Sequence, residues 1–155
     1  MATAQHVPLN LDVVPSAAAL RIAIVVSEWN KEITENLYQG AYAVLKQKNC
    51  TDILRINVPG SLELVYGCKL AMDSDYDAII ALGSVIRGET AHFDYVCEAV
   101  ALGIKDLNLQ GKSPVIFGVL TDDTLSQAQA RSGGKLGNKG VEAAVAAIMM
   151  AKLAI

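Results

Sequence analysis

The sequence predicts an α/β protein, a three-layer α/β/α sandwich in which a four-stranded parallel sheet lies between helices. Two observations lead to this fold class. Four short β-rich runs recur along the chain, and each is followed by a segment in which apolar residues have helical spacing. Strands and helices that alternate at this length imply right-handed crossovers, and therefore a parallel sheet covered on both faces.

The four predicted strands lie at residues 22–26, 53–58, 78–82 and 115–120. Three of these runs are nearly continuous in apolar residues, which is typical of strands buried on both faces of a parallel sheet. The run at 53–58 alternates, which favours a position nearer the edge of the sheet. The segment HVPLNLDVV is compatible with an additional N-terminal strand. We therefore expect an extended N-terminal segment over 1–20 and a single domain over 21–155.

Each predicted strand is followed by apolar residues spaced so that they share one face of a helix. These stripes are Leu37, Ala41, Val44 and Leu45; Leu62, Val65, Tyr66 and Leu70; Phe93, Val96, Cys97, Val100, Ala101 and Ile104; and Val141, Ala144, Val145, Ile148 and Met149. Ser61 is expected to cap the second helix. Asp123 is expected to cap a short helix that runs through Ala130, and the glycine-rich stretch SGGKLGNKG to be a flexible connector before the last helix.

Composition excludes several classes of protein. The chain has 155 residues, 52% of them hydrophobic, and a net charge of -3, so it fits one globular domain without the basic surface of a nucleic-acid binder. No apolar run is long enough to span a membrane, and the N-terminus has no secretory signal pattern. The three cysteines have no CxxC spacing and the two histidines lie far apart, so we expect reduced thiols, a cytoplasmic location and no metal site.

Unusual residues lie at or just beyond the ends of the predicted strands. Trp29 and Asn30 follow the first strand, residues 59–63 (PGSLE) the second, and residues 83–92 (GSVIRGETAH) the third, while Phe117 lies in the fourth. Each admits a plain structural explanation, such as rim packing for the tryptophan or ordinary turn chemistry for Pro-Gly-Ser. Ligands of open parallel sheets bind outside the carboxyl ends of the strands, so the four segments together favour a binding site at that edge.

Several residues suit an anionic or polyhydroxyl ligand. Gly88, Glu89 and Thr90 precede a helix whose N-terminus would favour a phosphate, although the glutamate could simply complement the helix dipole. Arg131 and Lys139 flank the glycine-rich connector and offer two cations. A Walker A interpretation of that connector fails, because no hydroxyl-bearing residue follows the lysine.

These segments together resemble the lumazine synthase (6,7-dimethyl-8-ribityllumazine synthase) family of riboflavin biosynthesis. The resemblance covers the chain from Arg21 to its end and rests on five ordered motifs: Trp29-Asn30, VPGSLEL, ALGSVIRGETAHFDYV, PVIFGVLT and QAQARSGGKLGNKGVEAA. It implies a flavodoxin-like fold and a transferase that works without a cofactor or metal. That enzyme condenses 5-amino-6-(D-ribitylamino)uracil with 3,4-dihydroxy-2-butanone 4-phosphate and releases phosphate and water.

The resemblance also implies a role for each candidate residue. His92 would transfer protons, which suits a side chain that titrates near neutrality. The residues implied to hold the phosphate are Gly88, Glu89, Thr90 and Arg131. Those implied to contact the pyrimidine ring and its ribityl chain are Trp29, Asn30, Ser61, Leu62, Glu63, Val85, Ile86, Phe117 and Lys139. In this family, Phe117, Arg131 and Lys139 would come from the neighbouring subunit of a homopentamer, which puts each active site between adjacent subunits.

Some positions depart from the family pattern. Trp29 stands where phenylalanine is usual, and Ser61 and Leu62 replace a small residue and an aromatic one, but none of these changes removes a group that the reaction needs. The short connector resembles that of members that form 60-subunit icosahedral capsids, against the alternatives of pentamers or decamers.

Other functions compatible with the sequence are a non-catalytic flavodoxin-like module that binds a flavin or lumazine, a shell protein, and a pentameric riboflavin synthase. His92 and Arg131 count against the first, because simple binding needs neither. A shell protein would need neither Glu63 nor the phosphate turn, and the GNKG and GETAH motifs favour the lumazine type over riboflavin synthase.

Overall fold

The computed structural model describes residues 9–153 and has the predicted three-layer α/β/α architecture. Its sheet contains β1 (Arg21–Ser27), β2 (Asp52–Val58), β3 (Ala78–Ile86) and β4 (Val115–Asp122). All pairings are parallel, in the order β2-β1-β3-β4. The four predicted strands are confirmed, and the alternating one, β2, is indeed at an edge. All four carboxyl ends therefore meet at one edge of the sheet.

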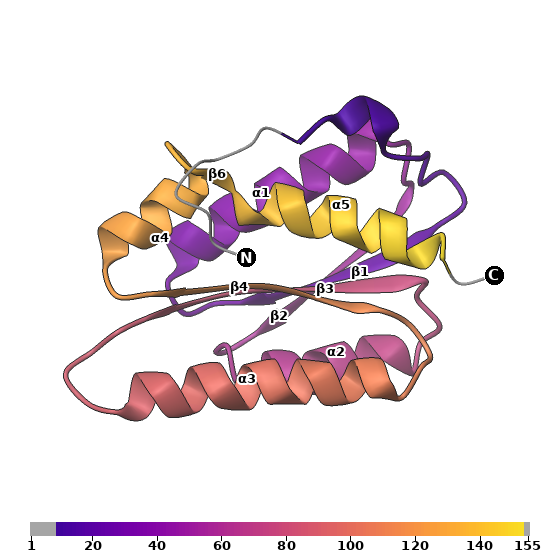
Figure 1. Cartoon of the computed structure of the whole chain (residues 1–155). Coiled ribbons are helices and arrows are strands. Elements are labelled where there is room, and N and C mark those ends of the chain that lie inside the picture. Colours follow the sequence, from indigo (N-terminus) through magenta and orange to yellow (C-terminus); the bar gives the residue numbers. More distant parts are fainter. Residues whose placement is uncertain (1–8, 154–155) are drawn as a thin grey trace.

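Five helices cover the two faces of the sheet (Figure 1). Helices α1 (Lys31–Gln47), α4 (Leu125–Arg131) and α5 (Lys139–Ala151) lie on one face, and α2 (Leu64–Met72) and α3 (His92–Leu109) lie on the other. Side chains that alternate along the strands feed two apolar clusters, one on each face. On β1, for example, Ile24 enters the cluster under α1 and α5, whereas Val25 enters the cluster under α2 and α3. Among residues 9–153, no helix has the length and apolar character needed to cross a membrane.

The contact between α1 and α5 depends on a glycine. A Cβ atom at Gly140 would lie 1.9 Å from the carbonyl oxygen of Leu37, so only glycine permits this approach. Asn138 fixes the same junction, because its Oδ1 accepts the Gly140 N–H at 2.8 Å while its Nδ2 donates to the Asn36 carbonyl at 2.9 Å. The asparagine thus caps α5 and ties its first turn to α1.

The predicted buried face of α2 is wrong except at Val65, which is partly buried against the cluster under α2 and α3. Leu62, Tyr66 and Leu70 are exposed and form what we call the outer α2 face. The buried residues of this helix are instead Leu64, Gly67, Cys68, Ala71 and Met72. Because apolar residues occur all around this segment, periodicity alone does not distinguish the inward stripe from the outward one. Ser61 is also not the N-cap: the helix begins after Glu63, which makes no side-chain capping bond.

Local details of the C-terminal half also differ from expectation. The cap of α4 is Thr124, which forms a reciprocal capping box with Gln127, rather than Asp123. The expected flexible connector contains a two-stranded antiparallel hairpin, β5 (Ser132–Gly134) and β6 (Gly137–Asn138). Ala101 and Met149, at the margins of their predicted stripes, are exposed.

The N-terminal strand is not formed over the part of its segment that the structure describes. Residues 6–8 lie outside the described range, and Leu11–Val13 forms a short 3₁₀ helix, η1. Asn10 Oδ1 accepts the Asp12 N–H at 2.9 Å, which favours this turn over an extended chain.

Candidate functional site

A cavity of about 500 Å³ opens at the carboxyl edge of the sheet. Its size lies within the range typical of small-molecule sites, and its position is the one expected for a parallel α/β sheet. Its walls come from the turns after β1 and β2, the end of β3 and the first turns of α3. The residues that line it are Trp29, Gly60, Ser61, Leu62, Glu63, Ser84, Val85, Ile86, Gly88, Thr90, His92, Phe93 and Val96.

The turn after β1 presents an open aromatic surface. The Trp29 side chain is 72% exposed, while its backbone N–H donates to the Pro59 carbonyl at 3.1 Å. Next to it, Asn30 takes a left-handed conformation with φ 56°, which asparagine tolerates well. The Asn30 Nδ2 donates to the Ser84 carbonyl at 2.9 Å. Asn30 therefore does not line the cavity but joins the β1 turn to β3.

Unpaired hydroxyl groups lie at the bottom of the site. Ser61 and Ser84 line the cavity and are almost fully buried, and neither Oγ has a hydrogen-bond partner among the described residues. A Cβ at Gly83 would lie 2.7 Å from the Ser61 Oγ, so glycine leaves room for this hydroxyl over β3. A buried hydroxyl without a partner costs about 1–3 kcal/mol, so these groups favour a ligand that offers hydrogen bonds.

In the turn after β2, Gly60 leaves space for the carboxylate of Glu63. A Cβ at Gly60 would lie 2.8 Å from the Oε2 of Glu63. Both residues line the cavity, together with the half-exposed Leu62. This wall therefore combines one carboxylate with apolar surface.

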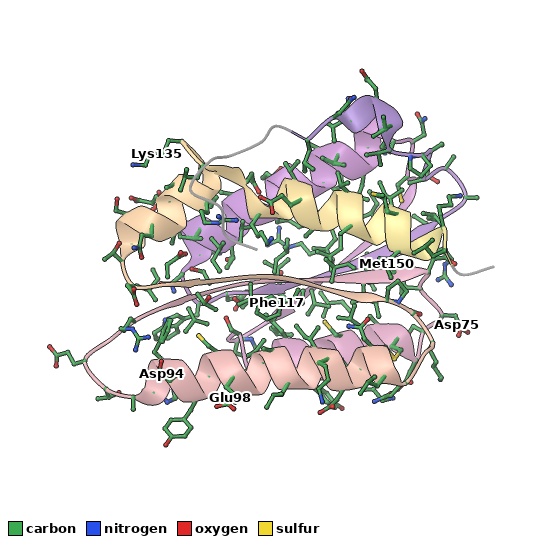
Figure 2. The ribbon with its side chains drawn as sticks, in the orientation of Figure 1. Asp75, Asp94, Glu98, Phe117, Lys135 and Met150 are labelled. Carbon is green, nitrogen blue, oxygen red and sulfur yellow. The ribbon has the colours of Figure 1, made fainter. Side chains whose placement is uncertain are left out.

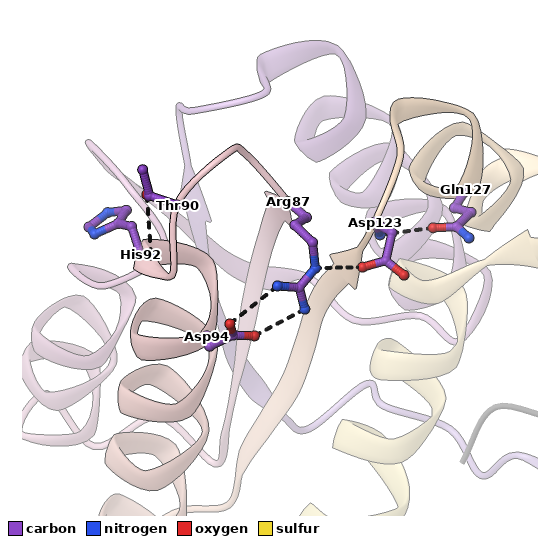
Figure 3. A network of polar contacts seen from close by, with 6 residues as sticks. All are labelled: Arg87, Thr90, His92, Asp94, Asp123 and Gln127. Carbon is purple, nitrogen blue, oxygen red and sulfur yellow. Dashed lines mark hydrogen bonds and ion pairs between the residues drawn. The ribbon is translucent and has the colours of Figure 1, made fainter.

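The turn between β3 and α3 is open toward solvent. No atom lies within 4 Å of the position that a Cβ would take at Gly88. The Thr90 Oγ1 accepts the N–H of His92 at 3.4 Å (Figure 3), close to the start of α3. Thr90 and His92 line the cavity, whereas Glu89 is exposed and does not. A helix N-terminus beside a hydroxyl and an uncovered glycine backbone suits an anion.

Arg87 lies in the middle of this turn but is held by two carboxylates (Figure 3). Its Nη1 and Nη2 donate to the two oxygens of Asp94 at 3.2 and 3.0 Å, and its Nε donates to the Oδ1 of Asp123 at 2.8 Å. The hydrogen bonds to Asp94 and then Asp123 raise the pKa of the guanidinium further. The guanidinium also lies over the Phe93 ring, 4.1 Å from its centroid.

Besides Asn30 and Glu89, three more predicted site residues do not line this cavity. Phe117 is half-buried on β4 and packs, within the sandwich, against the cluster under α2 and α3 (Figure 2). Arg131 and Lys139 belong to α4 and α5, which lie on the opposite face of the sheet from α2 and α3. Both cations approach Glu142: the Lys139 Nζ lies 2.9 Å from Oε2 and the Arg131 Nη2 lies 3.7 Å from Oε1.

The partly buried carboxyl of Asp122 interacts with the positive charge of Arg131. Asp122 ends β4, and its Oδ2 is buried without a hydrogen-bond partner among the described residues. Burial raises the pKa of Asp122, and the positive charge of Arg131 opposes this shift.

Sequence reasoning missed four residues of the cavity wall: Gly60, Ser84, Phe93 and Val96. The last two were expected only to pack, as part of the α3 stripe. A signal was available for Val96, because the residue four positions after His92 lies on the same face of the helix, whereas Phe93 only adjoins His92 in sequence. Gly60 and Ser84 adjoin predicted site residues in sequence, which was the available signal for them.

Comparisons with known proteins identify the family to which the chain is similar. The family model described as 6,7-dimethyl-8-ribityllumazine synthase matches residues 19–154. Proteins of that name from Christiangramia forsetii and Flavobacterium johnsoniae are 58% and 55% identical to this chain, over 90% and 89% of its length and 86% and 74% of theirs. The protein of that name from Porphyromonas gingivalis is 50% identical over 99% of this chain and 98% of its own.

Proposed function

The chain belongs to the 6,7-dimethyl-8-ribityllumazine synthase family, and we propose that its cavity is where 5-amino-6-(D-ribitylamino)uracil condenses with 3,4-dihydroxy-2-butanone 4-phosphate. The amine adds to the ketone and loses water to form an imine, phosphate is eliminated, and the ribitylamino nitrogen closes the second ring with loss of a second water. Each step moves protons and none moves electrons. The protein therefore needs to orient two substrates and to supply a proton donor and acceptor.

The observation that carries this proposal is the convergence of three turns on one cavity. Trp29 offers an exposed ring, Glu63 a carboxylate, and Thr90 and His92 a hydroxyl and an imidazole at a helix N-terminus. An aromatic face, hydrogen-bonding groups and an anion-favouring turn match a substrate pair that contains a planar ring, a polyol and a phosphate. A non-catalytic binding module would have no use for the imidazole.

We assign the pyrimidine substrate to the wall formed by the β1 and β2 turns and β3. Trp29 stacks on the ring, and the backbone of Val85 and Ile86 contacts the ring edge. Ser61 and Glu63 bind the ribityl hydroxyls, a role that the unpartnered Ser61 hydroxyl supports. The phosphate of the second substrate lies at Gly88 and Thr90, with the backbone of Glu89 as a further donor, and His92 transfers protons between the two substrates.

We also propose that each site is completed by a neighbouring subunit of a homopentamer. Within one chain, Phe117, Arg131 and Lys139 do not line the cavity, and the two cations lie on the other face of the sheet. The exposed outer α2 face is the kind of apolar surface that subunits cover. We further propose that these pentamers associate into a 60-subunit shell. The protein would work in the cytoplasm, where thiols such as that of Cys97 stay reduced.

Product formation tests the reaction itself. The two substrates are mixed without added cofactor and the absorbance of the lumazine is followed, with the spontaneous condensation as the reference. A rate above that reference, lost on heat denaturation, supports the proposal. A rate equal to the reference for correctly folded protein contradicts it.

Mixed oligomers test the shared site. His92→Ala and Arg131→Ala proteins should each be impaired, and each is also taken alone through the same unfolding and refolding cycle as a control. In a closed ring that draws His92 from one chain and Arg131 from the next, random equal mixing restores about one quarter of the sites. A confirmed mixed oligomer whose activity does not exceed the mean of the two parents would place each site within one chain.

A further inference from the structure

We propose that Arg87 is a positioning residue for the phosphate turn, residues 88–90, and does not bind the phosphate itself. This inference rests on the proposed function. Arg87 lies between two residues that line the cavity, Ile86 and Gly88, yet its side chain joins the first turn of α3 to the turn between β4 and α4. Arg87 itself precedes the phosphate turn, and its side chain holds Asp94, which follows the turn, so this one residue restrains the turn on both sides.

The charges around Arg87 argue against direct phosphate binding. One guanidinium faces two carboxylates, Asp94 and Asp123, so the local group carries a net negative charge at neutral pH. The three nitrogens of the guanidinium already donate to these carboxylates in a fork geometry. A phosphate could bind Arg87 only by displacing Asp94 or Asp123, which are already hydrogen-bonded to its guanidinium.

The turn has few other restraints. Among the described residues, one hydrogen bond involves residues 88–90, the 3.4 Å contact from the His92 N–H to the Thr90 Oγ1. The Arg87 backbone N–H donates to the Asp122 carbonyl at 3.0 Å, which aligns the residue before the turn with the end of β4. On the other side of the turn, the Arg87 side chain holds Asp94 and covers the ring of Phe93, which lines the cavity. Loss of Arg87 would therefore release the turn and the adjacent wall together.

Two variants separate positioning from direct binding. Arg87→Lys keeps the charge but loses the fork that holds both carboxylates. Asp123→Asn keeps Arg87 and removes the charge of one of its partners. If Arg87 positions the turn, both variants raise the KM of the butanone phosphate by about 3- to 10-fold, the effect of losing one or two exposed ion pairs. The KM of the pyrimidine substrate stays within about 2-fold of the native value.

Direct binding gives a different pattern. Removal of the Asp123 charge would then free Arg87 for the phosphate and lower that KM, while Arg87→Lys would still raise it. Opposite signs in the two variants, equal effects on both substrates, or no effect in either variant would each overturn the proposal. Asp106→Asn is the matched control, because Asp106 forms an exposed ion pair with Lys105 farther along α3; it should change neither KM.

A measurement without turnover keeps this test independent of the reaction. Hydrogen–deuterium exchange of the assembled protein should be faster across residues 87–92 in both variants and unchanged in the control. Unchanged exchange in both variants would overturn the positioning role even if the protein is active. Faster exchange in a protein that makes no lumazine would instead refute the proposed function alone.

Discussion

Trp29→Ala should weaken binding of the pyrimidine substrate far more than it weakens the fold. A tryptophan presents about 200 Å², and the Trp29 side chain is 72% exposed, so about 140 Å² is open to a ligand. A ring stacked on one face would cover about half of this area, which contributes about 2 kcal/mol at roughly 25 cal/mol per Å². Stacking adds on the order of 0.5–1.5 kcal/mol. The dissociation constant should therefore rise about 60- to 300-fold.

Calorimetric titration with the pyrimidine substrate alone measures this effect. Trp29→Phe is the matched variant, because it keeps an aromatic face and should lose less than about 1 kcal/mol of binding. The backbone bond from the Trp29 N–H to Pro59 does not depend on the side chain, so the unfolding free energy should change by less than about 1 kcal/mol in either variant. If the alanine and phenylalanine variants bind equally well, Trp29 does not stack on the ring.

Two further predictions concern stability. Hydrogen bonds from Arg55, and then Gln39, lower the pKa of Glu35, so the unfolded chain binds a proton at higher pH than the folded one. The stability that this pair contributes is complete above the ordinary pKa and is lost as the pH falls through the lowered one. Glu35→Gln should therefore cost at most about 1 kcal/mol near neutrality, since the pair is partly exposed, and nothing once the pH is well below the lowered pKa of Glu35. Urea unfolding measures this cost, and a cost that persists in strong acid would contradict the prediction. Gly140→Ala should destabilise the protein by about 3 kcal/mol or more, because α5 must move away from the Leu37 carbonyl. Gly88→Ala is the control: it has open space around it and should leave the thermal midpoint of unfolding nearly unchanged.

The sequence predicts the sheet better than it predicts the helix faces, for a physical reason. Strands buried on both faces need continuous apolar runs, and such runs are unambiguous in 22–26 and 78–82. In α2, apolar residues occur all around the helix, so the buried stripe depends on neighbours that are distant in sequence. A helix cap depends on the geometry of a single turn, and the choice between two adjacent capping residues is not visible in the sequence: Thr124, rather than Asp123, caps α4.

The position of the cavity could also be predicted, because parallel strands bring their carboxyl ends to one edge. Trp29, Glu63 and His92 do meet at one cavity there. What could not be predicted is how side chains from separate turns pair with one another. The contact of Arg87 with both Asp94 and Asp123 joins residues 7 and 36 positions apart, and no local pattern encodes it.

Leu62 belongs to two surfaces at once, since it lines the cavity and also begins the outer α2 face. A mutation at this position therefore changes both the wall of the cavity and the outer α2 face. Tyr66 and Leu70 belong to that face but do not line the cavity. Only side chains that satisfy both demands can persist at position 62, just before α2, so fewer substitutions are tolerated there than at Tyr66 or Leu70 within the helix.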